Sequence, residues 1–83
     1  MRANVKEIKR GNYLFVMEVD TGGAGLEYNC WVYKENGEVL KDDTGCQIVK
    51  FFGNTFNMAH FNNFINKFIQ DENYRNKFLF SNT

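Results

Sequence analysis

Three side chains of this sequence are of the types that perform nucleophilic catalysis or bind zinc. His60 is the only histidine, and Cys30 and Cys46 are the only cysteines. A cysteine beside a histidine could act as a nucleophile, and the three together could contribute metal ligands. The spacing argues against both, because His60 falls on the polar side of a predicted helix and Cys30 on the apolar side of a predicted strand. We therefore expect a solvated histidine, two free thiols, no catalytic residue, no cofactor and no metal site.

The triplet Asp-Thr-Gly occurs twice, at Asp20–Gly22 and at Asp43–Gly45. It resembles the signature of the aspartic proteases, and the resemblance implies a hydrolytic dyad in which two carboxylates share one proton. However, the later apolar-apolar-Gly element of that family is missing, and the two triplets are too close in the sequence for a two-lobed enzyme. The same triplet forms an ordinary turn when the Asp side chain accepts a backbone N–H. We reject the protease interpretation.

A glycine-rich loop contains Gly22, Gly23 and Gly25. Such a loop could surround a phosphate only if a helix began directly after it. A predicted strand follows instead, so we interpret the loop as a flexible connection between strands.

The stretch from Leu26 to Leu40 predicts a β-hairpin and contains the strongest candidate for a binding surface. Asn36-Gly37 is typical of a two-residue type I′ turn, in which both central residues have positive φ. This turn would pair Glu35 with Glu38, Lys34 with Val39, and Tyr33 with Leu40. The alternation of side chains then assigns Leu26, Tyr28, Cys30, Val32 and Val39 to one face, and Trp31, Tyr33 and Leu40 to the other.

The second of these faces combines two large aromatic side chains with carboxylates, which is the composition of an interface anchor with a polar rim. We predict that it binds a basic surface of a protein partner. Two alternatives stay open: Trp31 and Tyr33 face the core while Tyr28 and Cys30 face out, or one helix covers each face. The candidate partner-binding residues are Glu27, Trp31, Tyr33, Glu35, Glu38 and Asp42.

The remaining segments predict the scaffold that holds this hairpin. Residues 13–19 and 46–52 are rich in β-branched and aromatic residues, which favours strands, and residues 1–10 form either a short strand or one helical turn. From residue 57 to 70 the period changes to that of an amphipathic helix, with Asn54 or Thr55 as the expected N-cap. Its apolar stripe consists of Met58, Phe61, Ile65, Phe68 and Ile69, with Phe64 at the edge.

Asp71 can cap a second, shorter helix that carries Tyr74 and Phe78. Because strands come first and helices last, we predict a single α+β domain over residues 1–83. Its expected architecture is a three- to four-stranded antiparallel β-meander followed by one or two C-terminal helices packed on one face.

The formal net charge is zero, but the charges are unevenly distributed. They sum to +3 over residues 1–10, −5 over residues 18–43 and +2 over residues 44–83. The acidic middle disfavours nucleic acid and favours a basic protein partner. The N-terminus is charged and no long apolar stretch follows, so we expect no signal peptide, no membrane span and a cytoplasmic protein with reduced thiols, in the host cytoplasm if it is phage-encoded.

These observations predict a small non-enzymatic interaction domain. Small Pro-free domains rich in Asn, Lys and Phe are common among proteins of bacteriophages and mobile elements, and many of those inhibit host defence enzymes, as anti-CRISPR proteins do. We therefore hypothesise an inhibitor of this type. The alternative is a nucleic-acid-binding module that uses Lys67, Arg75, Lys77 and the basic residues near the N-terminus. Homodimerisation through an edge strand or the Trp31 face is a third hypothesis.

Overall fold

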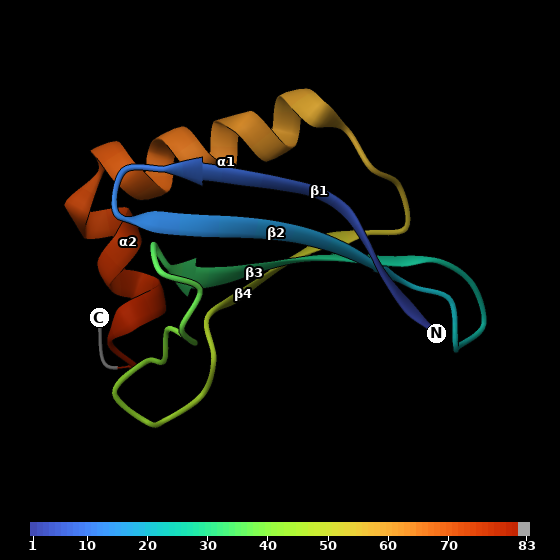
Figure 1. Ribbon diagram of the computed structural model, residues 1–83, viewed down its shortest axis with the longest axis horizontal. Helices are drawn as coiled ribbons and strands as arrows, with labels where there is room; N and C mark the ends of the chain where they lie inside the picture. Colours follow the sequence, from blue (N-terminus) through green and yellow to red (C-terminus); the bar gives the residue numbers. More distant parts are fainter. Residues whose placement is uncertain (82–83) are drawn as a thin grey trace.

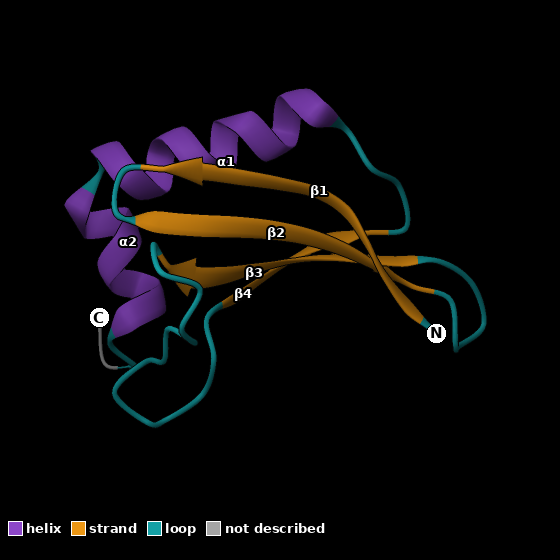
Figure 2. Cartoon of the chain, viewed as in Figure 1, coloured by secondary structure: helices purple, strands orange, loops and turns teal. Residues whose placement is uncertain are grey.

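The computed structural model describes residues 1–81 and has two layers, a four-stranded antiparallel sheet and two helices (Figures 1 and 2). The strands follow one another in space as they do in the sequence, in the order β1-β2-β3-β4. This confirms the predicted α+β meander with C-terminal helices. The elements are β1 (Arg2–Arg10), β2 (Tyr13–Asp20), β3 (Glu27–Lys34), β4 (Val49–Gly53), α1 (Met58–Gln70) and α2 (Glu72–Leu79).

Residues 2–10, for which a strand and a helical turn both remained open, form the long edge strand β1. Its pairing with β2 is interrupted between Asn4 and Lys6, so that Val5 forms a bulge. The bulge adds one unpaired residue to the strand and bends it locally. In Figure 1 the N-terminal half of β1 overlaps the ends of β2 and β3 in the view, while its residues stay paired with the end of β2.

The helices begin where polar side chains can accept the first free N–H groups. Asn57 caps α1, because its Oδ1 accepts from the N–H groups of Ala59 at 2.8 Å and His60 at 3.1 Å. The expected cap at Asn54 or Thr55 is therefore wrong. Phe56 stacks on Tyr28 with ring centroids 6.1 Å apart, and this contact lies before the first helical turn. Asp71 caps α2 as expected, by accepting from the N–H of Tyr74 at 3.0 Å.

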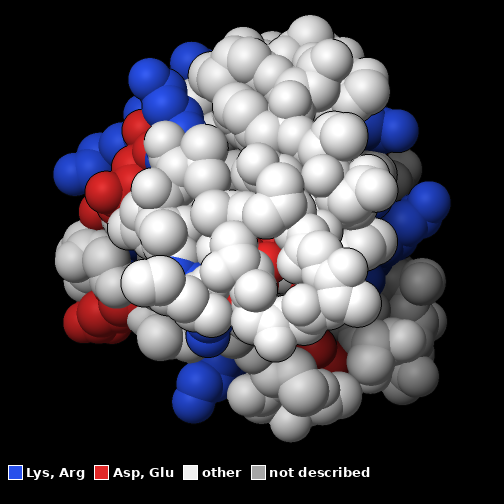
Figure 3. Space-filling view, turned by 90° about the vertical axis from the view of Figure 1, so that its right-hand side faces the viewer, with Lys and Arg blue, Asp and Glu red and all other residues white. Residues whose placement is uncertain are grey.

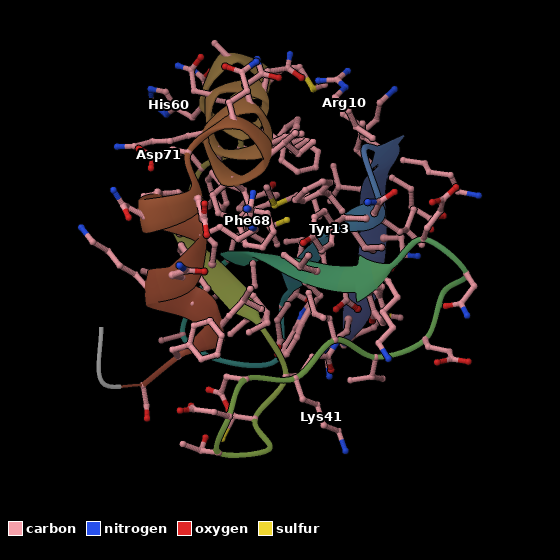
Figure 4. All side chains as sticks on the ribbon, turned by 90° about the vertical axis from the view of Figure 1, so that its left-hand side faces the viewer. Arg10, Tyr13, Lys41, His60, Phe68 and Asp71 are labelled. Atoms are coloured by element: carbon pink, nitrogen blue, oxygen red, sulfur yellow. The ribbon has the colours of Figure 1, made fainter. Side chains whose placement is uncertain are left out.

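The core lies between the sheet and α1 and is largely aromatic. Phe68 occupies its centre, with the rings of Tyr13, Phe15, Phe64 and Phe78 at centroid distances of 5.2 to 5.8 Å. Figure 4 shows Tyr13 and Phe68 pointing toward each other from the sheet and the helix. The fully or almost fully buried core residues are Phe15, Met17, Cys30, Val32, Ile48, Phe61, Phe64, Ile65 and Phe68.

Two positions of the predicted helical stripe differ from expectation. Phe64, placed at the edge of the stripe, is buried, because α2 adds the rings of Tyr74 and Phe78 on that side. Met58 is exposed, because the helix begins there and its first turn extends beyond the core.

The turn after β3 has three residues rather than two, so the predicted hairpin register is wrong by one residue. The N–H of Lys34 donates to the carbonyl of Glu38 at 2.8 Å, and Tyr33 pairs with Val39. Of the residues in this turn only Gly37 has positive φ, at 90°, and the Asn36 side chain accepts the N–H of Glu38 at 3.0 Å. A three-residue loop of this kind ends in one left-handed residue. Consequently Val39 shares a face with Tyr33 and Trp31, and Leu40 packs against the core.

Residues 38–48, which we call the arm, connect β3 to β4; both ends of the arm stay bonded to β3, through Val39 and Ile48. The predicted strand over residues 46–52 is therefore shorter than expected, since β4 begins only at Val49. The carboxylate of Asp42 holds the tip of the arm by accepting from the Thr44 N–H at 2.8 Å, the Thr44 hydroxyl at 2.6 Å and the Cys46 N–H at 2.9 Å. Asp43 joins the arm to α2: its N–H donates to Leu79 O at 3.0 Å, and its side chain accepts the Ser81 N–H at 2.9 Å.

Candidate protein-binding face

One face of the sheet packs on the helices, and the opposite face carries a second group of apolar side chains. Leu14 lies opposite Tyr33, Val16 opposite Trp31, and Trp31 opposite Val49, so these side chains alternate with core residues along each strand. Figure 4, which looks along the strands, shows both helices on one side of the sheet. We call the other side the open face; it consists of Leu14, Val16, Trp31, Tyr33, Val39, Val49 and Phe51.

Several residues of the open face expose much of their apolar surface. The exposed fraction is 59% for Phe51, 43% for Val39 and 38% for Val49. Trp31 and Tyr33 are partly exposed. Val16 is buried although neither helix lies over it, which indicates that the neighbouring side chains of this face close around it. Contiguous apolar surface of this kind on a small domain is typical of an interaction site.

The helices cover the side of β3 that carries Tyr28, Cys30 and Val32, as the sequence predicted. Cys30 and Val32 are fully buried, whereas Trp31 is partly exposed on the other side. Burial raises the pKa of the Cys30 thiol to about 12, so this cysteine is protonated and unreactive in the folded protein. The two alternatives for the hairpin, with Trp31 in the core or both faces covered, do not describe this structure.

Trp31 has a cationic neighbour that the sequence alone did not reveal. The guanidinium carbon of Arg2 lies 5.2 Å from the centroid of the Trp31 ring, and Arg2 Nη2 lies 2.8 Å from Glu18 Oε1. A guanidinium thus bridges a carboxylate and an indole on the open face. The alternation of β2 places Glu18 beside Val16, but the approach of Arg2 depends on the long β1 strand and its bulge.

The predicted acidic residues do not surround Trp31. Glu27 lies opposite Asp20 at the start of β3, roughly 13 Å along the strand from Trp31 at about 3.3 Å per residue. Glu35 and Glu38 lie at the other end, where Lys34 Nζ is 3.8 Å from Glu38 Oε2. Asp42 is occupied in the turn of the arm, and these hydrogen bonds, led by that of the Thr44 hydroxyl, lower its pKa. Tyr33 does share a face with Trp31.

The Glu27 end of the open face adjoins a cavity of about 670 Å³ beside the glycine-rich loop. Leu26, Glu27 and Phe51 contribute to its lining together with Asp20. The N–H of Gly22 donates to Asp20 at 2.9 Å, and this hydrogen bond lowers the pKa of the carboxyl. Figure 3 shows that this end of the molecule is mostly uncharged, with acidic side chains near its middle.

The residues considered for catalysis or metal binding do not come together in the structure. Asp20 ends β2 whereas Asp43 lies in the arm, at opposite ends of the sheet in Figure 1, so the two Asp-Thr-Gly triplets do not form a dyad. His60 is exposed on α1 and Cys46 is exposed in the arm, while Cys30 is buried. Among residues 1–81, no three His, Cys, Asp or Glu side chains gather as a metal site.

The predicted basic helix face is also altered by the fold. Arg75 Nη1 donates to the carbonyls of Phe68 and Ile69, both at 3.0 Å, and thereby caps the C-terminal end of α1. Lys67 Nζ lies 4.6 Å from the centroid of the Tyr74 ring. Arg75 is thus part of the helix packing. Of the three basic residues predicted to contact nucleic acid from the helices, Lys67 and Lys77 are those whose side chains form no hydrogen bond to a helix carbonyl within residues 1–81.

Comparison of the chain with protein families, with curated proteins and with solved structures finds no match. Neither helix in the described part of the chain has the length and apolar character needed to span a membrane.

Proposed function

We propose that the protein acts by binding another protein through its open face, with Trp31 as the anchor. The observation that carries this proposal is the uncovered apolar surface around Trp31, Val49 and Phe51 on a sheet whose other face is packed against the helices. Tryptophan and tyrosine at the centre of such a surface contribute most to binding, because they bury a large area and lose little conformational entropy.

A partner with basic residues fits the charges at the margin of this face. Glu7 and Glu27 form no ion pair within residues 1–81, and Glu18 already binds a guanidinium. The contacts of Arg2 support this proposal, because they place a cation over the indole and against the carboxylate of Glu18. We infer that an arginine or lysine of the partner can take the place of Arg2, whose side chain is itself half exposed.

Displacement of Arg2 would cost little. An exposed cation–π contact contributes about 0.5–1 kcal/mol and an exposed ion pair about 0–1 kcal/mol, whereas a central tryptophan contributes about 2 kcal/mol or more to an interface. Glu27, Glu35 and Glu38 lie toward the two ends of β3 and would orient the partner and raise the association rate. Inhibition of a host defence enzyme by a phage or mobile-element protein is the biological role that we propose for such binding.

Site-specific cross-linking can test the proposal before the partner is identified. A photo-reactive amino acid at Phe51 or Val39 should capture a partner in an extract of the host, and the same group at Met58, an exposed residue of α1, should not. With that partner purified, Trp31→Ala should weaken binding by about 2 kcal/mol, roughly 30-fold, and raised salt should weaken it further. Equal capture from Met58, or unchanged affinity of a folded Trp31→Ala variant, would contradict the proposal.

A second candidate function, binding of single-stranded nucleic acid, is favoured by the aromatic rings of Trp31, Tyr33 and Phe51 on one sheet face. Bases can stack on such rings, but binding also needs a positively charged groove along the backbone. The open face has Arg2 and Lys9 against Glu7, Glu18 and Glu27. Fluorescence titration with an oligonucleotide at low and high salt would detect this activity as a steep salt dependence.

A further inference from the structure

A groove runs between the free edge of β4 and α1, on the helix side of the sheet. It has a volume of about 510 Å³, and its floor is aromatic, formed by Phe52, Phe64 and Tyr74. Lys50 and Lys67 line it from the strand and from the helix. This volume is within the range of about 300–1,000 Å³ that is typical of binding pockets.

The lining of the groove is basic. Lys50, Lys67 and His60 contribute to it, and none of its lining residues is acidic. Lys50 pairs with Cys30, whose side chain is in the core, so the Lys50 side chain points to the helix side of the sheet. Figure 4 shows His60 on the outer side of α1, and its side chain is part of the groove lining. The groove therefore suits an occupant with carboxylates.

The backbone edge beside the groove is unpaired. β4 is the last strand of the sheet, and within residues 1–81 no other strand or loop forms a backbone hydrogen bond with Lys50–Gly53 on the side away from β3. Free N–H and C=O groups in a row form a template for an added strand. The opposite edge is protected, because β1 has a bulge at Val5 and exposed charges at Lys6 and Lys9.

We propose that this edge binds an extended acidic segment of a partner protein, which pairs with β4 as a fifth strand. The side chains of β4 define the sequence that fits. Residues of the added strand that point to the helix side would meet Lys50 and Lys67, and the residues between them would lie beside Val49 and Phe51 on the open face. The segment should therefore alternate acidic and apolar residues.

A second copy of this chain fits the edge poorly. Antiparallel pairing of two β4 strands would bring Lys50 close to the same residue of the other copy on the helix side. Like charges directly opposite one another on a sheet are destabilising. The basic lining thus favours a different protein with the opposite charge.

This inference shares Val49 and Phe51 with the function proposed for Trp31. It depends further on the backbone of β4 and on two lysines on the helix side, whereas the function proposed above depends on the indole of Trp31 and on Arg2. Trp31→Ala leaves the groove unchanged, and substitution of Lys50 and Lys67 leaves Trp31 and Arg2 unchanged. Either proposal can fail while the other holds.

A synthetic peptide provides the test. The probe is a short acetylated and amidated peptide in which valine and glutamate alternate, titrated to millimolar concentration into the ¹⁵N-labelled full chain. Its controls are a peptide of the same composition with the glutamates together, and one with lysine in place of glutamate. Two further versions carry N-methyl groups on the amides of one edge or of the other, so that each can pair through one edge only.

We expect the probe to shift the amide signals of Val49–Gly53 and of the α1 residues near His60 and Lys67, and to slow amide exchange in β4. The double variant Lys50→Glu with Lys67→Glu should bind about tenfold more weakly at low salt, because two attractive charge contacts become repulsive. Lys77→Glu, which makes the same change on α2 away from the groove, should bind like the original chain. Thermal unfolding by circular dichroism checks that all variants are folded.

Several results would overturn the inference. They are the absence of binding at millimolar peptide, equal binding of both N-methylated peptides, signal shifts at β1 rather than β4, and unchanged affinity of a folded double-lysine variant. Light scattering that shows a dimer of the chain, lost in the Lys50→Glu variant, would identify a second copy as the occupant and would also refute the proposal.

Discussion

The contrast between Phe68 and Phe51 offers the sharpest test of the two-sided sheet. Both are phenylalanines, but Phe68 is fully buried among four rings whereas Phe51 is 59% exposed on the open face. Truncation of a buried phenylalanine to alanine costs about 3–5 kcal/mol, because apolar burial is lost and a cavity remains. A domain of 83 residues has a total stability of roughly 4–12 kcal/mol at about 0.05–0.15 kcal/mol per residue.

Phe68→Ala should therefore lower the melting temperature by about 12 °C or more, since 1 kcal/mol corresponds to about 4–8 °C in a domain of this size. Phe51→Ala should change the free energy of unfolding by about 0.5 kcal/mol or less. The measurement is urea and thermal unfolding followed by circular dichroism. If Phe68→Ala does not fold, Phe68→Leu and Phe51→Leu provide the same comparison with a smaller loss.

Equal destabilisation by the two alanine substitutions would refute the reasoning. It would mean that Phe51 is packed as tightly as the core and that the face around Trp31 is not open. The proposed protein-binding function would then lose its basis. A stable Phe51→Ala variant that no longer binds the partner would be the strongest result in its favour.

Three further measurements test other features of the structure. Gly37→Ala should cost about 1 kcal/mol, because only this residue of the turn has positive φ, and Gly37→Asn should cost less; the urea midpoint measures both. Cys46 should react with a thiol reagent in the native protein, whereas Cys30, whose pKa is raised to about 12 by burial, should react only after unfolding. The Thr44 hydroxyl and backbone hydrogen bonds lower the pKa of Asp42 below its usual 3.8. The stabilisation that Asp42 provides is therefore complete above pH 3.8 and is lost as the pH falls through the lower pKa of the folded state. Asp42→Asn should make the free energy of unfolding less dependent on pH in that range, which urea unfolding at a series of pH values would measure.

Much of the fold could be predicted from the sequence because two periods are clear in it. The alternation along β2 and β3 assigned Cys30 to the core, and the spacing of Phe61, Ile65 and Phe68 defined the buried side of α1. Both patterns reflect burial, which is the largest favourable term in folding. The lengths of these segments and the turn residues between them then indicated that the strands come first in the chain and the helices last.

The details of the hairpin could not be predicted in the same way. Asn36-Gly37 is compatible with a two-residue and a three-residue loop, and the choice depends on where the Asn36 side chain finds its hydrogen bond. That one-residue difference reversed the faces of Val39 and Leu40. The arm was missed because Cys46–Ile48 has the composition of a strand, but its backbone bonds run to Leu40 and Asp42 within the arm and only Ile48 bonds to β3.

The composition of the candidate site depended on contacts between segments distant in sequence. Trp31 and Tyr33 were correctly placed on one face by alternation, whereas the ring of carboxylates around them was not formed. Strand length separated Glu27 from Glu35 and Glu38, and the turn of the arm engaged Asp42. Arg2 and Glu18 were missed because their contact depends on the pairing of β1 with β2, from which the Arg2 side chain extends to the indole on β3.

Asp43 is bonded to Leu79, the last residue of α2, and to Ser81 beyond it, so we expect the last helix and the arm to open as one cooperative unit. No residue of α2 is fully buried, so this helix gains much of its order from the arm and from the rings of Tyr74 and Phe78. Release of either segment should free the other, and their amides should exchange with solvent through a common opening while the sheet and α1 stay closed.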